Sequence, residues 1–177
     1  MTRIGLTPDE LLVATWAPGR RPVYAARAGG LNVLRGETVA LTGEGTGRLL
    51  DELGDALDSC VALNGAAAAA GGVLRVHAQR AARAGARALT VTEPFGDLDG
   101  AGTALAVADL AGLSDLGLTT VVQVADAALA ALAADRVAVV RDGEAVVSYP
   151  VLAPVPRTPD DVGPVAARLR ARLTDRD

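Results

Sequence analysis

A glycine-rich loop is the first place in the sequence where residue types and spacing point to chemistry. Gly43, Gly45, Thr46 and Gly47 follow an apolar run and lead directly into Arg48. If a helix begins here, its unpaired backbone N–H groups and its dipole favour an anion such as phosphate, and Arg48 adds a positive charge. The loop is therefore a candidate anion site, and a glycine-rich turn kept for packing is the alternative.

The rest of the chain offers few other reactive groups. Its 177 residues include one histidine, His77, one cysteine, Cys60, and no lysine, so all 17 basic residues are arginine. This composition excludes an intrachain disulfide, a zinc site built from several cysteines or histidines, and a Schiff-base lysine. We expect no metal site. The net charge of −4 argues against a nucleic-acid partner, because nucleic-acid binders carry a basic face.

The elements that must position the loop alternate between strands and helices. Residues 38–42 are apolar and β-branched, which predicts a buried strand, and residues 48–57 carry apolar side chains at helical spacing. Further strands are expected at 61–63, 88–92, 119–124 and 136–140, with helices at 73–87, 102–113, 126–134 and 162–173. This order predicts an α/β fold in which helices cover both faces of a mainly parallel sheet.

Two antiparallel pieces complete the expected sheet. Residues 11–16 and 22–26 flank a turn rich in proline and glycine, which predicts an antiparallel β piece near the N-terminus. Asp142 and Gly143 separate residues 136–140 from 144–149, a pattern typical of a β-hairpin.

We expect one core domain over residues 1–156, followed by a C-terminal helix or tail over residues 157–177. The beginning of the chain lacks the basic and apolar regions of a signal peptide. No stretch reaches the roughly 18 apolar residues that a membrane span needs. These observations predict a cytoplasmic protein.

Four segments, in this order, resemble the nucleotide-binding subunits of ABC transporters. Residues 34–43 resemble the approach to the phosphate loop, and residues 93–99 the end of the Walker B strand with the D-loop. Residues 119–126 resemble the strand that leads to the switch histidine, and residues 135–144 the hairpin that follows it. The resemblance implies a P-loop NTPase-like fold and ATP, with or without Mg²⁺, as the ligand. It also implies a dimeric partner and a membrane transporter subunit.

The resemblance assigns roles to individual residues. Glu93 matches the catalytic glutamate, which acts as a general base, and Asp99 matches the D-loop aspartate, with helix capping as the alternative. Trp16 occupies about the place of the aromatic residue that stacks on adenine, with Tyr24 as a second candidate. A core or hairpin aromatic is the alternative for either ring. Gly43, Gly45, Thr46, Gly47 and Arg48 take the place of the phosphate loop.

That loop departs from the family pattern G-x-x-x-x-G-K-[ST] in its length and at the lysine and hydroxyl positions. It is one residue short, Arg48 stands in place of the lysine, and Leu49 and Leu50 supply no hydroxyl for Mg²⁺. Arginine keeps the charge, but its planar guanidinium does not replace a compact ammonium at a tight site. The carboxylate of Glu44 opposes phosphate by on the order of 1 kcal/mol or more.

Other landmarks of the active family are also altered. Thr92 stands where the Walker B aspartate would hold Mg²⁺, and Ala125 where the switch histidine would stand. Too few residues separate Cys60 from Ala88 for the helical subdomain that carries the signature motif and grips the transporter. These departures predict a pseudo-ATPase that has at most weak nucleotide binding and acts through protein contacts, with a second copy or with a catalytically complete ABC ATPase.

Two alternatives stay open at this point. One is a divergent but working ATP-binding subunit, an ATP hydrolase of the ABC type in which Arg48 replaces the lysine. The other is a nucleotide-independent structural or dimerisation module. Its candidate contact surfaces are the alanine-rich segment 127–134 and the helix 162–173, although the core-like spacing of Val165, Leu169 and Leu173 favours packing of this helix on its own domain.

Overall fold

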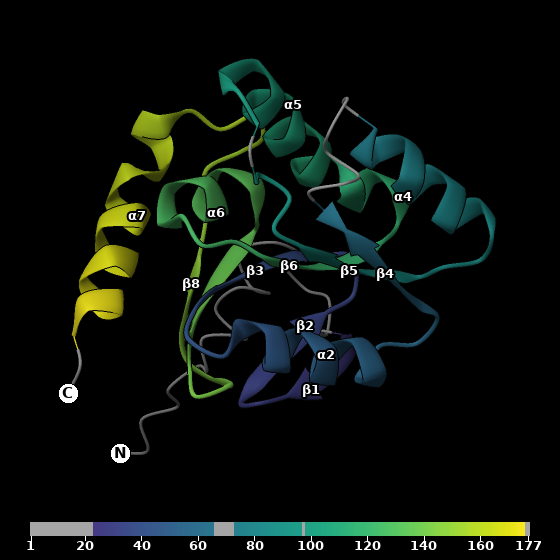
Figure 1. The fold of residues 1–177 in the computed structure, drawn as a ribbon, viewed down its shortest axis with the longest axis horizontal. Coiled ribbons are helices and arrows are strands. Elements are labelled where there is room, and N and C mark those ends of the chain that lie inside the picture. The colour runs from purple at the N-terminus through teal and green to yellow at the C-terminus, as the bar shows by residue number, and fades with distance from the viewer. Residues whose placement is uncertain (1–22, 66–72, 97, 176–177) are drawn as a thin grey trace, which may run out of the picture.

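The computed structural model describes residues 23–65, 73–96 and 98–175. Its central element is the strand β3 (Thr38–Gly43). Its first five residues are buried, as expected for an apolar strand covered on both faces. It pairs in parallel with β6 (Thr119–Gln123) and β7 (Arg136–Arg141). The strand that leads into the glycine-rich loop therefore lies inside the sheet (Figure 1).

Within the described residues, six strands form this sheet, in the order β4-β5-β6-β3-β7-β8. The edge strand β4 (Cys60–Asn64) and its neighbour β5 (Ala88–Thr92) run parallel to the central strands. At the other edge, β8 (Glu144–Pro150) returns antiparallel to β7 after the turn at Asp142 and Gly143. The predicted α/β class, the mainly parallel sheet and the C-terminal hairpin are thus confirmed.

A separate antiparallel ribbon is formed by β1 (Tyr24–Ala28) and β2 (Leu31–Leu34). The antiparallel β piece expected near the N-terminus is therefore present, and β1 pairs with β2 along its length. The other strand that we expected in this piece, residues 11–16, lies outside the described residues, as does Trp16.

The helices cover both faces of the sheet. On one face, α2 (Thr46–Ala56) and the β1–β2 ribbon bury Leu49, Leu53 and Val33 against Val39 and Leu41 of β3. The opposite face is covered by α4 (Leu74–Arg83), α5 (Gly100–Ala111), the short helix η1 (Leu113–Leu116), α6 (Ala127–Ala133) and α7 (Pro159–Thr174) (Figure 1). Alternate residues of β3 thus face two separate cores.

The helix α7 packs against α6 and buries Val162, Ala166 and Leu169. Ala127, Ala130, Ala131, Ala133 and Ala134 are buried as well. The suggestion that the alanine-rich segment 127–134 forms an exposed contact surface is therefore wrong, because α6 fills the space between the sheet and α7.

Among the described residues, no helix is both long and apolar enough to cross a membrane.

Candidate functional site

The glycine-rich loop is packed tightly against the turn between β7 and β8. Gly43 has φ +116°, and a Cβ atom there would lie 2.3 Å from the carbonyl oxygen of Val140. Gly45, which precedes α2, has φ +76°, and its Cβ would lie 2.4 Å from the backbone nitrogen of Gly143. Glu44 donates its backbone N–H to Val140 O at 3.0 Å. Both glycines are therefore required by the backbone of the neighbouring hairpin.

The side chains that follow the loop have partners within the protein. Arg48 donates its Nε–H to Glu52 at 2.9 Å, one helical turn later, and its side chain is 71% exposed. Thr46 is buried, and its Oγ1 accepts a hydrogen bond from Gln123 Nε2 at 3.0 Å. Gly47 lies in the first turn of α2, where a Cβ would meet no atom within 4 Å.

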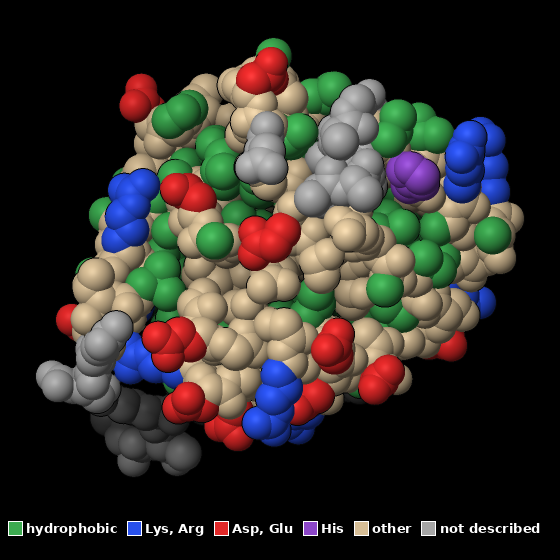
Figure 2. All heavy atoms as spheres, in the orientation of Figure 1, with side chains coloured by type: hydrophobic (Ala, Val, Ile, Leu, Met, Phe, Trp, Pro, Cys, Tyr) green, Lys and Arg blue, Asp and Glu red, His purple; other side chains and the backbone are tan. Residues whose placement is uncertain are grey.

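Several acidic residues belong to this loop or to the elements next to it. Glu44 lies in the loop itself, Asp142 lies in the turn against which Gly45 packs, and Asp51 and Glu52 follow on α2. The face formed by α2 and the β7–β8 turn shows acidic side chains with basic side chains between them (Figure 2). Such charges oppose a polyphosphate, which carries several negative charges at short range.

The predicted catalytic residue Glu93 lies just beyond the end of β5, with β6 between β5 and β3. Its backbone has φ +42°, which is uncommon for a residue other than glycine. The side chain is exposed and forms no hydrogen bond or ion pair with any described residue. Ala125, in the place of the switch histidine, contributes only its carbonyl oxygen, which accepts a hydrogen bond from Thr42 Oγ1 at 3.3 Å.

Asp99 caps the N-terminus of α5. Its Oδ1 accepts a hydrogen bond from the backbone nitrogen of Gly102 at 2.7 Å, the contact typical of an aspartate N-cap. Tyr24, the second candidate for an adenine platform, is 46% exposed on β1. The structure therefore brings Gly43, Gly45, Thr46, Gly47 and Arg48 together, and it places Glu93 and Asp99 beyond the end of another strand.

Sequence analysis missed a buried ion pair at the other end of β3. Arg136 Nη2 lies 2.5 Å from Glu37 Oε1, and the two side chains are 2% and 0% exposed. The same Oε1 accepts a hydrogen bond from Leu34 N at 2.7 Å, and Arg136 also donates to the carbonyl oxygen of Asn32. The pair therefore joins the β1–β2 ribbon to the start of the main sheet.

Burial raises the pKa of Glu37 from 4.5 to about 7, while the Arg136 guanidinium and the Leu34 N–H act in the opposite direction. The one signal for this pair in the sequence is an arginine at the start of an apolar strand, since a buried charge requires a partner.

In the part of the chain that the structure describes, no group of acidic, histidine or cysteine side chains is arranged to hold a metal ion.

Comparisons with known proteins place this geometry in a structural context. No protein-family model matches the chain, and no curated protein matches its sequence. Among solved structures, cbiO1 from Clostridium perfringens, part of the ABC transporter complex cbiONQ, aligns with a TM-score of 0.55 and 16% identity over 84% of this chain and 86% of its own.

Two other solved structures agree with this match. A bacterial Atm1-family ABC exporter with ATP bound aligns with a TM-score of 0.53 and 14% identity, over 86% of this chain and 39% of the exporter chain. MJ0796, a bacterial ABC transporter cassette solved as a dimer, aligns with a TM-score of 0.50 and 16% identity over 79% of this chain and 94% of its own. The chain therefore has the fold of the ATP-binding cassettes of ABC transporters.

Proposed function

We propose that this chain is an ABC-ATPase-like protein whose nucleotide site is degenerate: a pseudo-ATPase that acts through protein contacts, with at most weak nucleotide binding. The observation that carries the proposal is the packing of Gly43 and Gly45 on Val140 and Gly143. In a phosphate loop, such glycines let a phosphate come close to the backbone. In this arrangement, they let the β7–β8 turn come close to it instead.

Three further observations support the same proposal. The hydroxyl of Thr46 accepts a hydrogen bond from Gln123, and Arg48 is paired with Glu52. Glu44 and Asp142 place negative charge beside the loop, where a phosphate would need positive charge. Glu93, the one matched catalytic group, is not accompanied by the Walker B aspartate that would position a metal beside it.

The partner proposed is another folded cassette, either a second copy of this chain or a catalytically complete relative. The support is by analogy: MJ0796 was solved as a dimer, and cbiO1 is part of a transporter complex. A membrane transporter subunit is an indirect partner in this proposal, reached through the complete cassette. The proposed location is the cytoplasm.

ATP turnover tests the enzymatic part of the proposal. We expect the phosphate release rate of the wild-type chain with ATP and Mg²⁺ to equal that of Glu93→Gln, because Glu93 has no metal-bound phosphate to act on.

Arg48→Ala is expected to change the free energy of unfolding by no more than about 0.5 kcal/mol, since an exposed i,i+4 ion pair contributes about 0.3–0.5 kcal/mol.

Purified wild-type protein whose turnover clearly exceeds that of Glu93→Gln would contradict the pseudo-ATPase proposal. If Arg48→Ala removed that turnover as well, the divergent working ATP-binding subunit would become the better account. A catalytically complete cassette, assayed in parallel, serves as the positive control for the phosphate measurement.

A further inference from the structure

Charge is segregated along the part of the chain that forms α4, α5 and the elements next to them. Residues 59–87 contain four arginines, the single histidine and no acidic residue, whereas residues 88–135 contain seven acidic residues and no basic one. The first range includes α4, and the second includes α5, η1 and α6. These helices cover the same face of the sheet (Figure 1). This face therefore carries a basic region next to an acidic one.

The basic region lies at the end of α4 that is remote from α5. The two helices meet where the backbone nitrogen of Arg75, at the start of α4, donates to Asp109 Oδ2, near the end of α5, at 3.2 Å. From this junction, α4 runs away from α5 towards the right of the view in Figure 1. Arg80 and Arg83 lie in the second half of α4, and both are exposed. Neither side chain forms an ion pair or a hydrogen bond within the described part of the chain.

Three exposed carboxylates lie at the other end of this face. Glu93 follows β5, Asp99 caps α5, and Asp126 caps α6 by accepting hydrogen bonds from the backbone nitrogens of Ala128 and Leu129 at 2.8 and 2.9 Å. Because β5 and β6 are parallel neighbours, the residues that follow them lie at one edge of the sheet. None of the three carboxylates forms an ion pair with a described residue.

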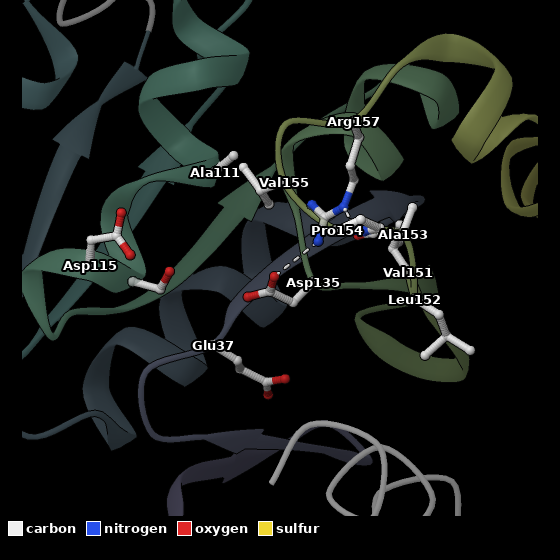
Figure 3. Close-up of a pocket in the computed structure, with 11 residues that line it drawn as sticks. Glu37, Ala111, Asp115, Asp135, Val151, Leu152, Ala153, Pro154, Val155 and Arg157 are labelled. Atoms are coloured by element: carbon white, nitrogen blue, oxygen red, sulfur yellow. Dashed lines mark hydrogen bonds and ion pairs between the residues drawn. The ribbon is translucent and has the colours of Figure 1, made fainter.

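The other described acidic residues of this range contribute less to the charge at that end. Asp109 is buried. Asp135 is neutralised by Arg157, whose Nη2 lies 3.1 Å from its Oδ1 and whose side chain is 4% exposed. Figure 3 shows this pair at the wall of a cavity, with Asp115 of η1 apart from it. The negative charge that remains exposed is therefore concentrated where α5 and α6 begin.

Hydrophobic side chains lie between the two charged regions. Val76, in the first turn of α4, is 41% exposed, and Leu105, in the middle of α5, is 47% exposed. Figure 2 shows hydrophobic side chains over both helices, acidic ones near the start of α5 and basic ones at the outer end of α4. An apolar centre with charged groups at its rim is typical of a protein–protein interface.

We propose that this α4–α5 surface binds a second copy of the chain about a two-fold axis. Such an axis places the same surface on both sides of the interface. The acidic end of one copy then faces the basic end of the other, twice, and Val76 and Leu105 are covered. A second copy is favoured because it carries both charges in matching places, whereas an anionic membrane would attract the arginines and repel the acidic end.

This inference rests on the proposed function only in the premise that the chain acts through protein contacts. It selects a second copy as the partner and places the contact on the face of the sheet opposite to α2. The association needs no nucleotide and can therefore be measured without it.

Sedimentation equilibrium without nucleotide tests the association. We expect a concentration-dependent dimer whose Kd rises at least about tenfold between about 50 and 500 mM NaCl, because salt screens exposed charges. A wild-type chain that stays monomeric at about 200 μM in low salt would overturn the inference. That result would leave the pseudo-ATPase proposal intact, which ATP turnover tests separately.

Charge-reversed variants locate the interface. One variant is Arg80→Glu with Arg83→Glu, and the other is Glu93→Arg with Asp99→Asn and Asp126→Asn, since asparagine keeps a helix N-cap. Each alone is expected to dimerise with a Kd at least about tenfold higher than that of the wild type, because like charges then face each other. An equimolar mixture is expected to form a heterodimer, which also shows that both variants are folded.

The matched control is Arg27→Glu with Arg35→Glu. These exposed residues lie on β1 and just after β2, in the ribbon that covers the opposite face of the sheet, and the substitutions change the net charge as the α4 pair does. The control should dimerise as the wild type does. A control weakened as much as the α4 variant, or reversed variants that do not associate when mixed, would refute the assignment of this surface.

Discussion

Replacing Arg136 with methionine is expected to lower the free energy of unfolding by about 3–5 kcal/mol at pH 8. The substitution leaves the fully buried carboxylate of Glu37 without its counter-ion, and removing one partner of a buried ion pair has an effect of this size. It also removes the hydrogen bond to Asn32 that ties the β1–β2 ribbon to the sheet. Urea unfolding of the purified variant measures the loss.

The dependence of this loss on pH identifies Glu37 as its source. A folded-state pKa above the unfolded value means that the folded protein retains a proton that the unfolded chain releases, so stability falls as the pH rises from 4.5 towards about 7. Removing Arg136 takes away a charge that lowers this pKa. The fall in stability therefore extends to higher pH in the variant, and its loss relative to the wild type should be larger at pH 8 than at pH 5.

The matched control is the double variant Glu37→Leu with Arg136→Met. An apolar pair of similar volume leaves no buried charge, so its stability should exceed that of Arg136→Met, and its pH dependence over this range should be weaker. A loss under about 1 kcal/mol in Arg136→Met, or a loss that does not change with pH, would contradict the role assigned to the pair.

Alanine at Gly43 or Gly45 is expected to lower the free energy of unfolding by about 2–4 kcal/mol. Each position has a positive φ, which costs roughly 1–2 kcal/mol for a residue with a Cβ atom. In addition, the new Cβ would lie 2.3 Å from Val140 O or 2.4 Å from Gly143 N, so the loop and the β7–β8 turn must separate. Thermal or urea unfolding without any ligand measures the effect.

Gly47→Ala is the control within the same loop. This residue lies in the first turn of α2, and nothing occupies the space that a Cβ would fill. Alanine there is expected to be neutral, or stabilising by up to about 1 kcal/mol, because it favours the helix. Comparable stability of all three variants would mean that the glycines are not needed for packing and would favour an anion-binding role for the loop.

The strands of this fold could be predicted because their residues are apolar and β-branched over short stretches bounded by turns. The alternation of such stretches with helical patterns predicted the parallel sheet, and the pair Asp142 and Gly143 predicted the hairpin. These signals are local, and each strand requires only its own residues to be recognised. The capping role of Asp99, one of two alternatives at the outset, has the same local origin.

The contacts that engage the glycine-rich loop and form the buried ion pair join residues that are far apart in the sequence. Glu37 and Arg136 are 99 positions apart, and Thr46 and Gln123 are 77 apart. The proximity of Gly45 to Gly143 depends on β3 and β7 being neighbours, which the sequence of either strand does not specify. Likewise, the pairing of Arg48 with Glu52 rather than with a ligand depends on the direction of one flexible side chain.

Thermal unfolding with and without millimolar ATP and Mg²⁺ tests the proposal that the glycine-rich loop binds nucleotide weakly at most. A ligand at a hundred times its Kd adds about 2.7 kcal/mol, which raises the Tm of a domain of this size by roughly 5–10 °C. We predict a shift of less than about 1 °C, the same in the wild type and in Arg48→Ala. A shift of about 5 °C or more in the wild type that disappears in Arg48→Ala would contradict this account.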